Sequence, residues 1–129
     1  MIHSIGTDII EVKRIKNAVK KNKNFVNKIF TDSEIEYCRK KKNFYINYAG
    51  RFAAKEAIAK LFGKNIRPVI YKEIEIKNGA NGEPKTSLSG GTKLLAKRLG
   101  FKKFLISISH TENYAVAMAL GERSCSKGL

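Results

Sequence analysis

The sequence contains no apolar run that approaches the roughly 20 residues a membrane-spanning helix needs. Its first ten residues, MIHSIGTDII, lack the basic start and long apolar stretch of a secretory signal. Internal repeats, low-complexity segments and linkers are also missing. Because 129 residues suffice for one domain with a core, we expect a single soluble, cytoplasmic domain that does not bind membranes.

Cysteine is scarce. Cys38 and Cys125 lie far apart in the chain, and together with His3 and His110 they do not form the spacing of a zinc site. This pattern favours a reduced compartment and argues against structural zinc.

Acidic residues are also few: 11 Asp and Glu stand against 26 Lys and Arg, which gives a net charge of +15. Such a field speeds encounter with anionic partners, which include nucleic acids, phosphorylated small molecules and acidic proteins. Lys outnumbers Arg by 20 to 6, and Arg is the usual reader of base edges, so the balance weighs slightly against sequence-specific DNA binding. A basic nucleic-acid-binding module stays open as an alternative, although no helix-turn-helix, zinc or aromatic RNA-binding signature is present.

Hydrophobic spacing, capping patterns and turn residues predict an α+β order of β-α-α-α-β-β-α-β-β in one domain over residues 1–122, followed by a tail at 123–129. The mostly antiparallel sheet should pack against the long central helix. The expected strands cover residues 2–10, 69–76, 86–88, 104–110 and 114–120, with unstructured chain from Gly121. The first expected helix begins at Glu11, and the others cover 32–41, 45–62 and 92–99.

The long helix contains the run GRFAAKEAIAKLF, which is apolar around most of the helix and should therefore be buried. Glu56 and Lys60 nevertheless lie on the arc between Phe52 and Ala57. They could form an exposed i,i+4 pair worth about 0.3–0.5 kcal/mol. A functional role for these charges is the other interpretation.

Two further polar residues end predicted strands. Asp8 ends the first strand, where it could be the N-cap of the helix that begins near Glu11. His110 ends the strand FLISISH, where it could be an ordinary turn residue. Taken singly, each residue has a structural as well as a functional interpretation.

Three motifs occur in one order: IGTDIIEVKRI, RFAAKEAIAKLFG and SISHTENYAVAMAL. Together they resemble the holo-[acyl-carrier-protein] synthase family of small 4′-phosphopantetheinyl transferases, and the resemblance extends from residue 1 to about residue 122. It implies that family's fold and its reaction in fatty acid biosynthesis, in which the phosphopantetheine arm of coenzyme A moves to a serine of acyl carrier protein.

The resemblance also assigns the catalytic and metal-binding residues. Asp8 and Glu56 would be the ligands of Mg²⁺, which takes one or two carboxylates together with substrate phosphates; Mn²⁺ would also suit such oxygen donors. Lys60, one turn beyond Glu56, would add positive charge near the same phosphates. Glu56 is the first candidate to accept the serine proton, directly or through water.

The coenzyme-binding residues implied by the resemblance are His110 and Thr111, which match a phosphate-contacting segment and are expected at the 3′-phosphate. Arg51 and the turn that contains Gly82 and Pro84 are further expected contacts, in addition to Lys60.

The helix that begins at Glu11 has a basic outer surface, which suits the acidic recognition helix of an acyl carrier protein. An ordinary solvated face is the alternative interpretation. The resemblance further implies a homotrimer with active sites in the clefts between subunits. The basic residues of this surface are Lys13, Arg14, Lys16, Lys20 and Lys21.

Overall fold

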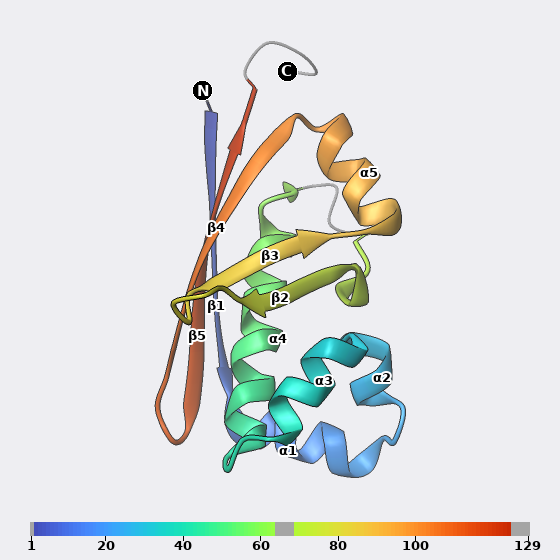
Figure 1. Ribbon diagram of the computed structural model, residues 1–129, viewed down its shortest axis with the longest axis vertical. Coiled ribbons are helices and arrows are strands. Elements are labelled where there is room, and N and C mark those ends of the chain that lie inside the picture. Colours follow the sequence, from blue (N-terminus) through green and yellow to red (C-terminus); the bar gives the residue numbers. More distant parts are fainter. Residues whose placement is uncertain (1, 64–68, 125–129) are drawn as a thin grey trace.

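The computed structural model describes residues 2–63 and 69–124. Figure 1 shows a sheet along one side of the molecule, the long helix α4 beside it, and a hairpin that crosses in front of that helix. The elements in chain order are β1 (Ile2–Glu11), α1 (Val12–Lys21), α2 (Phe25–Ile29), α3 (Asp32–Arg39), α4 (Phe44–Lys60), the 3₁₀ turn η2 (Tyr71–Glu73), β2 (Ile74–Asn78), β3 (Pro84–Leu88), α5 (Gly90–Arg98), β4 (Phe101–His110) and β5 (Tyr114–Arg123).

The larger sheet has the strand order β1-β5-β4, and both pairings are antiparallel. Alternate residues of β5 point to opposite faces, and its inward residues Ala115, Ala117 and Ala119 are fully buried. These small side chains let α4 lie close to the sheet, and α4 makes many contacts with both β5 and β1. The expected packing of an antiparallel sheet against the long helix is therefore confirmed.

The remaining strands form a separate two-stranded sheet, β2-β3, so the strands divide between two sheets where the sequence suggested one. The turn between them is closed by the Gly79 N–H, which donates to Glu83 O at 2.7 Å. Gly82 in this turn has φ 83°, a conformation that glycine adopts without strain. The turn chemistry read from the sequence thus lies where it was expected.

The elements differ from the sequence prediction in several places. The short helix α2 was not expected, and residues 71–73 form a 3₁₀ turn where a strand was predicted. The Glu73 carboxylate accepts hydrogen bonds from Gly91 N and Thr92 N at the start of α5, which draws this segment away from the sheet. β5 continues through Arg123 because that residue pairs with both neighbouring strands. The remaining predicted tail, 125–129, lies outside the described residues.

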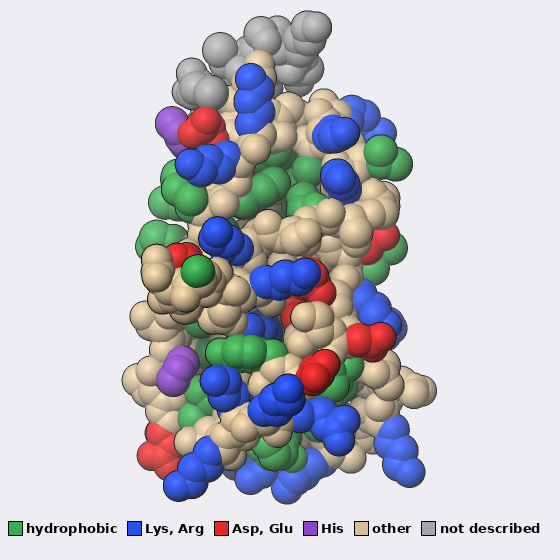
Figure 2. All heavy atoms as spheres, viewed as in Figure 1, with side chains coloured by type: hydrophobic (Ala, Val, Ile, Leu, Met, Phe, Trp, Pro, Cys, Tyr) green, Lys and Arg blue, Asp and Glu red, His purple; other side chains and the backbone are tan. Residues whose placement is uncertain are grey.

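The core surrounds α4 and includes the fully buried Phe30, Ile58 and Ile74. Cys38 is also buried, and burial raises the pKa of its thiol to about 11, so the thiol stays protonated at neutral pH. Within residues 2–63 and 69–124, no helix is long and apolar enough to cross a membrane. On the face shown in Figure 2, Lys and Arg side chains are spread over helices and strands alike.

Candidate functional site

Asp8 lies on the face of β1 that is directed toward α4, opposite Ala117 of β5. The Lys60 ammonium is 3.3 Å from Asp8 Oδ1 and donates to Thr7 O at 2.8 Å. The residue that caps α1 is Glu11, three positions later, so the alternative role of Asp8 as a helix cap is wrong. The structure instead joins Asp8 to Lys60 of α4.

Glu56 is half-buried on the same flank of α4, one turn before Lys60. Its partner in the structure is Tyr71: burial, a hydrogen bond to Glu56 and the negative charges of Glu56 and Asp8 raise the pKa of the Tyr71 hydroxyl. Among the ion pairs of the described chain, Lys60 pairs with Asp8 and not with Glu56, so the i,i+4 interpretation is wrong. The negative charges of Asp8 on β1 and Glu56 on α4 thus both raise the pKa of the Tyr71 hydroxyl.

These two carboxylates are a donor set that suits Mg²⁺. Hard cations of this size prefer oxygen ligands and usually bind through one or two carboxylates, with substrate phosphates and waters filling the other positions. No group of three or more His, Cys, Asp or Glu side chains in residues 2–63 and 69–124 is placed to hold a metal by itself. Asp8 and Glu56 are therefore the described residues that could contribute oxygen ligands to such a cation.

A pocket of about 240 Å³ lies on the other flank of α4, between this helix, the β2-β3 turn and the end of β4. It is lined by four of the residues predicted to contact the coenzyme: Arg51, Gly82, Pro84 and His110. Thr111 is next to this pocket in sequence, and its hydroxyl accepts hydrogen bonds from Asn113 N and Tyr114 N in the β4–β5 turn. The structure thus brings four of the predicted coenzyme residues together, whereas Thr111 does not line this pocket and Lys60 lies beside Asp8 instead.

Arg51 is the buried cation of this pocket, with 6% of its surface exposed. Its Nη2 donates to Asn78 Oδ1 at 2.7 Å, and its guanidinium lies 4.1 Å from the centre of the Tyr37 ring. Asn78 in turn donates to Gly82 O at 3.0 Å, which fixes the glycine turn. Arg51 Nε is buried and has no hydrogen-bond partner among the described residues.

The two groups of residues lie on opposite sides of one helix. Arg51 and Lys60 are nine positions apart on α4, and at about 100° per residue this separates them by about 180° around its axis. Lys60 faces Asp8 of β1, whereas Arg51 faces Asn78 of β2. One chain therefore presents two groups of candidate residues that face in different directions. We call Asp8 and Glu56 the acidic half-site, and the pocket at Arg51 the basic half-site.

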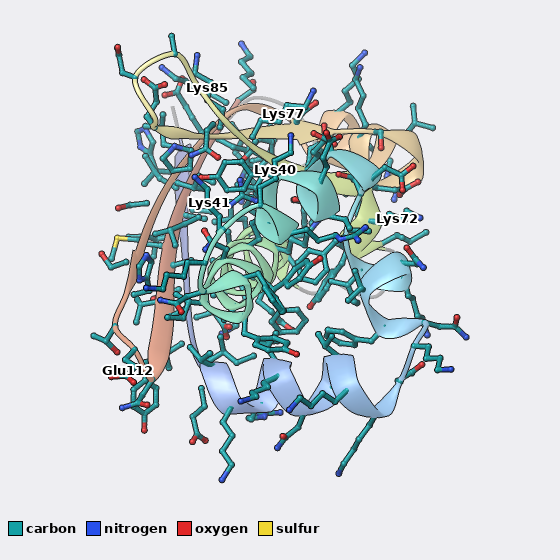
Figure 3. The ribbon with its side chains drawn as sticks, turned by 60° about the horizontal axis from the view of Figure 1, so that its bottom comes forward. Lys40, Lys41, Lys72, Lys77, Lys85 and Glu112 are labelled. Atoms are coloured by element: carbon teal, nitrogen blue, oxygen red, sulfur yellow. The ribbon has the colours of Figure 1, made fainter. Side chains whose placement is uncertain are left out.

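Helix α1 buries Val12 and Ile15 and exposes the other side. A groove of about 630 Å³ runs between α1 and the β4–β5 turn, where Glu112 contributes to its lining. Figure 3 shows side chains of α1 projecting away from the body of the molecule, with Glu112 at the turn beside one end of the helix. The five basic residues predicted for this surface are all exposed: Lys13, Arg14, Lys16, Lys20 and Lys21.

Several functional neighbours were missed from the sequence. Tyr37, Tyr71 and Asn78 approach the site from other elements, and no local pattern marks their side chains. The buried ion pair of Glu34 and Lys55 was also missed; the capping-box pattern was the only signal, and it predicted just the start of α3.

The chain matches a family model described as the 4′-phosphopantetheinyl transferase superfamily over residues 4–119. A holo-[acyl-carrier-protein] synthase of Halothermothrix orenii is 42% identical over 123 residues, which cover 95% of this chain and 98% of that protein.

Solved structures give the same result. The holo-ACP synthase of Plasmodium yoelii superposes with a TM-score of 0.83 at 35% identity, over 96% of this chain and 99% of that chain. The holo-[acyl-carrier-protein] synthase of Helicobacter pylori, solved in complex with coenzyme A, superposes with a TM-score of 0.80 at 30% identity, over 92% of this chain and 99% of that chain.

Proposed function

This chain belongs to the 4′-phosphopantetheinyl transferase superfamily, and we propose that it transfers 4′-phosphopantetheine from coenzyme A to a serine of acyl carrier protein, releasing adenosine 3′,5′-bisphosphate. The observation that carries this proposal is the joint presence of the acidic half-site at Asp8 and Glu56 and the basic pocket at Arg51, in a chain that matches holo-[acyl-carrier-protein] synthases over nearly its full length.

Asp8 and Glu56 would hold Mg²⁺, or Mn²⁺, which when bound neutralises charge on the diphosphate of the coenzyme. The serine oxygen forms a bond to the phosphorus that bears the pantetheine arm, and the bond from that phosphorus to the leaving bisphosphate breaks. Glu56 accepts the serine proton, directly or through one water. Lys60, whose side chain is about half exposed and pairs with Asp8, would add positive charge near the oxygens of the coenzyme's diphosphate.

The pocket at Arg51 would hold the other end of the coenzyme. The Arg51 side chain lines this pocket with its positive charge, and His110 adds an imidazole. Because the Thr111 hydroxyl already accepts two hydrogen bonds, its own hydrogen is free to donate to a phosphate oxygen. These groups suit the 3′-phosphate.

The exposed basic surface of α1 would bind the acidic carrier protein. It adjoins the groove at the β4–β5 turn, so a docked helix would have both a charged surface and a depression to occupy. Attraction of this kind raises the association rate and weakens as salt is added.

We propose that the enzyme acts as a homotrimer, because one chain presents its two half-sites on opposite sides of α4. The outer face of the larger sheet is apolar and uncovered: Ile5 is 68% exposed, Ile9 64% and Met118 52%. A contiguous exposed apolar face is typical of an interface between subunits. Copies that associate through it would combine the acidic half-site of one chain with the basic pocket of the next.

The test mixes the purified protein with coenzyme A, an apo acyl carrier protein and Mg²⁺, and weighs the carrier by mass spectrometry. We expect the carrier to gain one phosphopantetheine, and the gain to stop when EDTA removes the metal. No gain with either Mg²⁺ or Mn²⁺ would refute the proposal. The nucleic-acid alternative predicts instead a DNA affinity that persists at physiological salt.

A further inference from the structure

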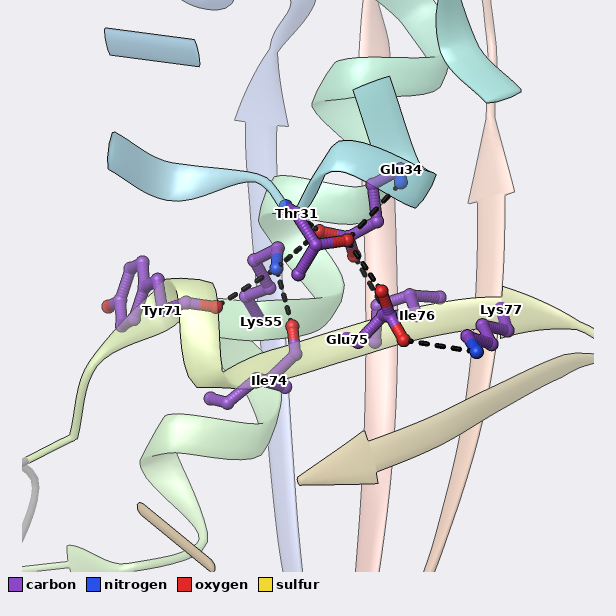
Figure 4. Close-up of polar contacts among 8 residues, drawn as sticks. All are labelled: Thr31, Glu34, Lys55, Tyr71, Ile74, Glu75, Ile76 and Lys77. Carbon is purple, nitrogen blue, oxygen red and sulfur yellow. Dashed lines mark hydrogen bonds and ion pairs between the residues drawn. The ribbon is translucent and has the colours of Figure 1, made fainter. Parts of the chain in front are cut away.

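Lys55 of α4 is fully buried, and it directly precedes Glu56 in the chain. Its ammonium lies 2.7 Å from Glu34 Oε1, donates to Tyr71 O at 2.9 Å, and also donates to Ile74 O (Figure 4). An ammonium has three N–H donors, so each has a partner. The side chain thus connects α4 to α3, η2 and β2 at one point.

Glu34 is equally buried and uses both carboxylate oxygens. Oε1 accepts from Thr31 N at 2.9 Å, which completes the capping box of α3, and Oε2 accepts from Ile76 N at 2.8 Å. The pair has no exposed surface on either side chain. Both charges are therefore paired and hydrogen-bonded, which is the condition under which buried ions are tolerated.

Together these contacts hold the free edge of β2. One edge of this strand pairs with β3. Along the other edge Lys55 binds Ile74 O, Glu34 binds Ile76 N, and Arg51 binds the Asn78 side chain. The contacts fall on every second residue, the period with which a strand repeats its orientation. Side chains of α3 and α4 here replace a neighbouring strand.

The held segment carries residues of both half-sites. Asn78 ends β2 and bonds to Arg51 in the coenzyme pocket, and η2, immediately before β2, carries Tyr71, the partner of Glu56. We infer that Glu34 and Lys55 are positioning residues for the proposed transfer. They hold η2 and β2 in place, and this position puts Asn78 beside Arg51 and Tyr71 beside Glu56. This inference rests on the proposed function.

A buried ion pair could instead serve folding alone, so the test must separate stability from substrate binding. We compare Glu34→Gln, Lys55→Met and the double variant with Ile58→Val, a substitution at a fully buried apolar residue of the same helix. Each is assayed for thermal midpoint, kcat and the KM of both substrates. We expect the KM for coenzyme A to rise about tenfold in the first three, the size typical when a residue that orients a ligand-binding group is lost.

The KM for the carrier should stay within about twofold, because α1 lies apart from this network. Lys55→Arg should recover part of the affinity for coenzyme A, since a guanidinium can still donate to the carbonyls. Ile58→Val should lower only the thermal midpoint. If the pair variants behave like Ile58→Val, with an unchanged KM for coenzyme A, the inference is overturned.

A single variant can fail to fold because it leaves one charge buried and unpaired, whereas the double variant leaves none. Hydrogen exchange on the unmodified protein gives an independent result: coenzyme A should slow exchange of the Ile76 amide more than that of the central strand β5. Equal effects would contradict the coupling. If the unmodified protein does not load the carrier, the proposed function fails; if it does while the variants match the control, only this inference fails.

Discussion

Gly6 on β1 lies against the backbone of Ala57 on α4: a Cβ at position 6 would be 2.2 Å from Ala57 O and 3.4 Å from Lys60 Cβ. Only a residue without a side chain permits this approach. Asp8, two residues later on the same face of β1, is thereby brought within reach of Lys60. The separation of strand and helix at Gly6 therefore sets the geometry of the acidic half-site.

Gly6→Ala should force β1 away from α4, because the obstacle is backbone and cannot rotate aside. We expect a loss of roughly 1–3 kcal/mol in the free energy of unfolding, measured with urea, together with a lower kcat. Gly91→Ala is the matched control, since a Cβ there meets its nearest atom only at 3.9 Å. Equal stability of the two variants would show that the contact has no energetic weight.

Glu56→Ala should abolish measurable turnover and Asp8→Asn should lower it strongly, and both variants should keep the fold. Asp8 pairs with a half-exposed lysine, so its loss should cost about 1 kcal/mol or less of stability. Any residual activity of Asp8→Asn should need about 10–100-fold more Mg²⁺. Glu36→Ala, a change at an exposed carboxylate, is the control. Near-normal turnover of Glu56→Ala would exclude our site.

Arg14→Glu should raise the KM for the carrier more than the KM for coenzyme A, because it reverses charge on the exposed side of α1. The difference from the unmodified protein should shrink as salt is added. Arg98→Glu makes the same charge change on α5, at another exposed position, and should have the smaller effect. An equal rise in both Michaelis constants would contradict docking on α1.

Met118→Asp should disrupt self-association by placing a charge on the apolar sheet face. Sedimentation velocity should show smaller species than for the unmodified protein, and activity should fall because the two half-sites no longer meet. Leu94→Asp, at a residue that is 69% exposed on α5, is the control for an added charge at an exposed apolar position. A trimer that survives Met118→Asp with full activity would reject this interface.

Glu73 gives a dependence on pH. Hydrogen bonds from the hydroxyl and the N–H of Thr92 hold the pKa of its carboxyl below the usual value. A group with a lowered folded pKa stabilises the fold above its unfolded pKa, near 4.5, and this stabilisation is lost as the pH falls through the folded pKa.

Relative to Glu73→Gln, the unmodified protein should be more stable at pH 7 by about 1 kcal/mol, the usual value of a helix cap. Urea titrations at several pH values should show this difference shrinking below about pH 4.5. A difference that is constant with pH would mean that the carboxylate charge is not involved.

The sequence was most informative where one segment contains its own signal. The alternation of β5, the capping box at Thr31 and the apolar run of the long helix all predicted their local structure correctly. The contacts that tie distant segments together were not predictable: Lys55 with Glu34, Arg51 with Asn78, and Glu73 with the start of α5. Each depends on a side chain from another element, and at Glu73 residues 71–73 of the predicted strand form a 3₁₀ turn instead.

The net charge of +15 has opposite consequences for the two kinds of association proposed here. Copies that gather through the sheet face repel one another, so dissolved ions, by screening that repulsion, should favour the assembled form. The same ions weaken capture of an acidic partner. The rate of carrier loading should therefore be highest at an intermediate ionic strength. At low salt the trimer should dissociate, and at high salt the enzyme should associate more slowly with the acidic carrier.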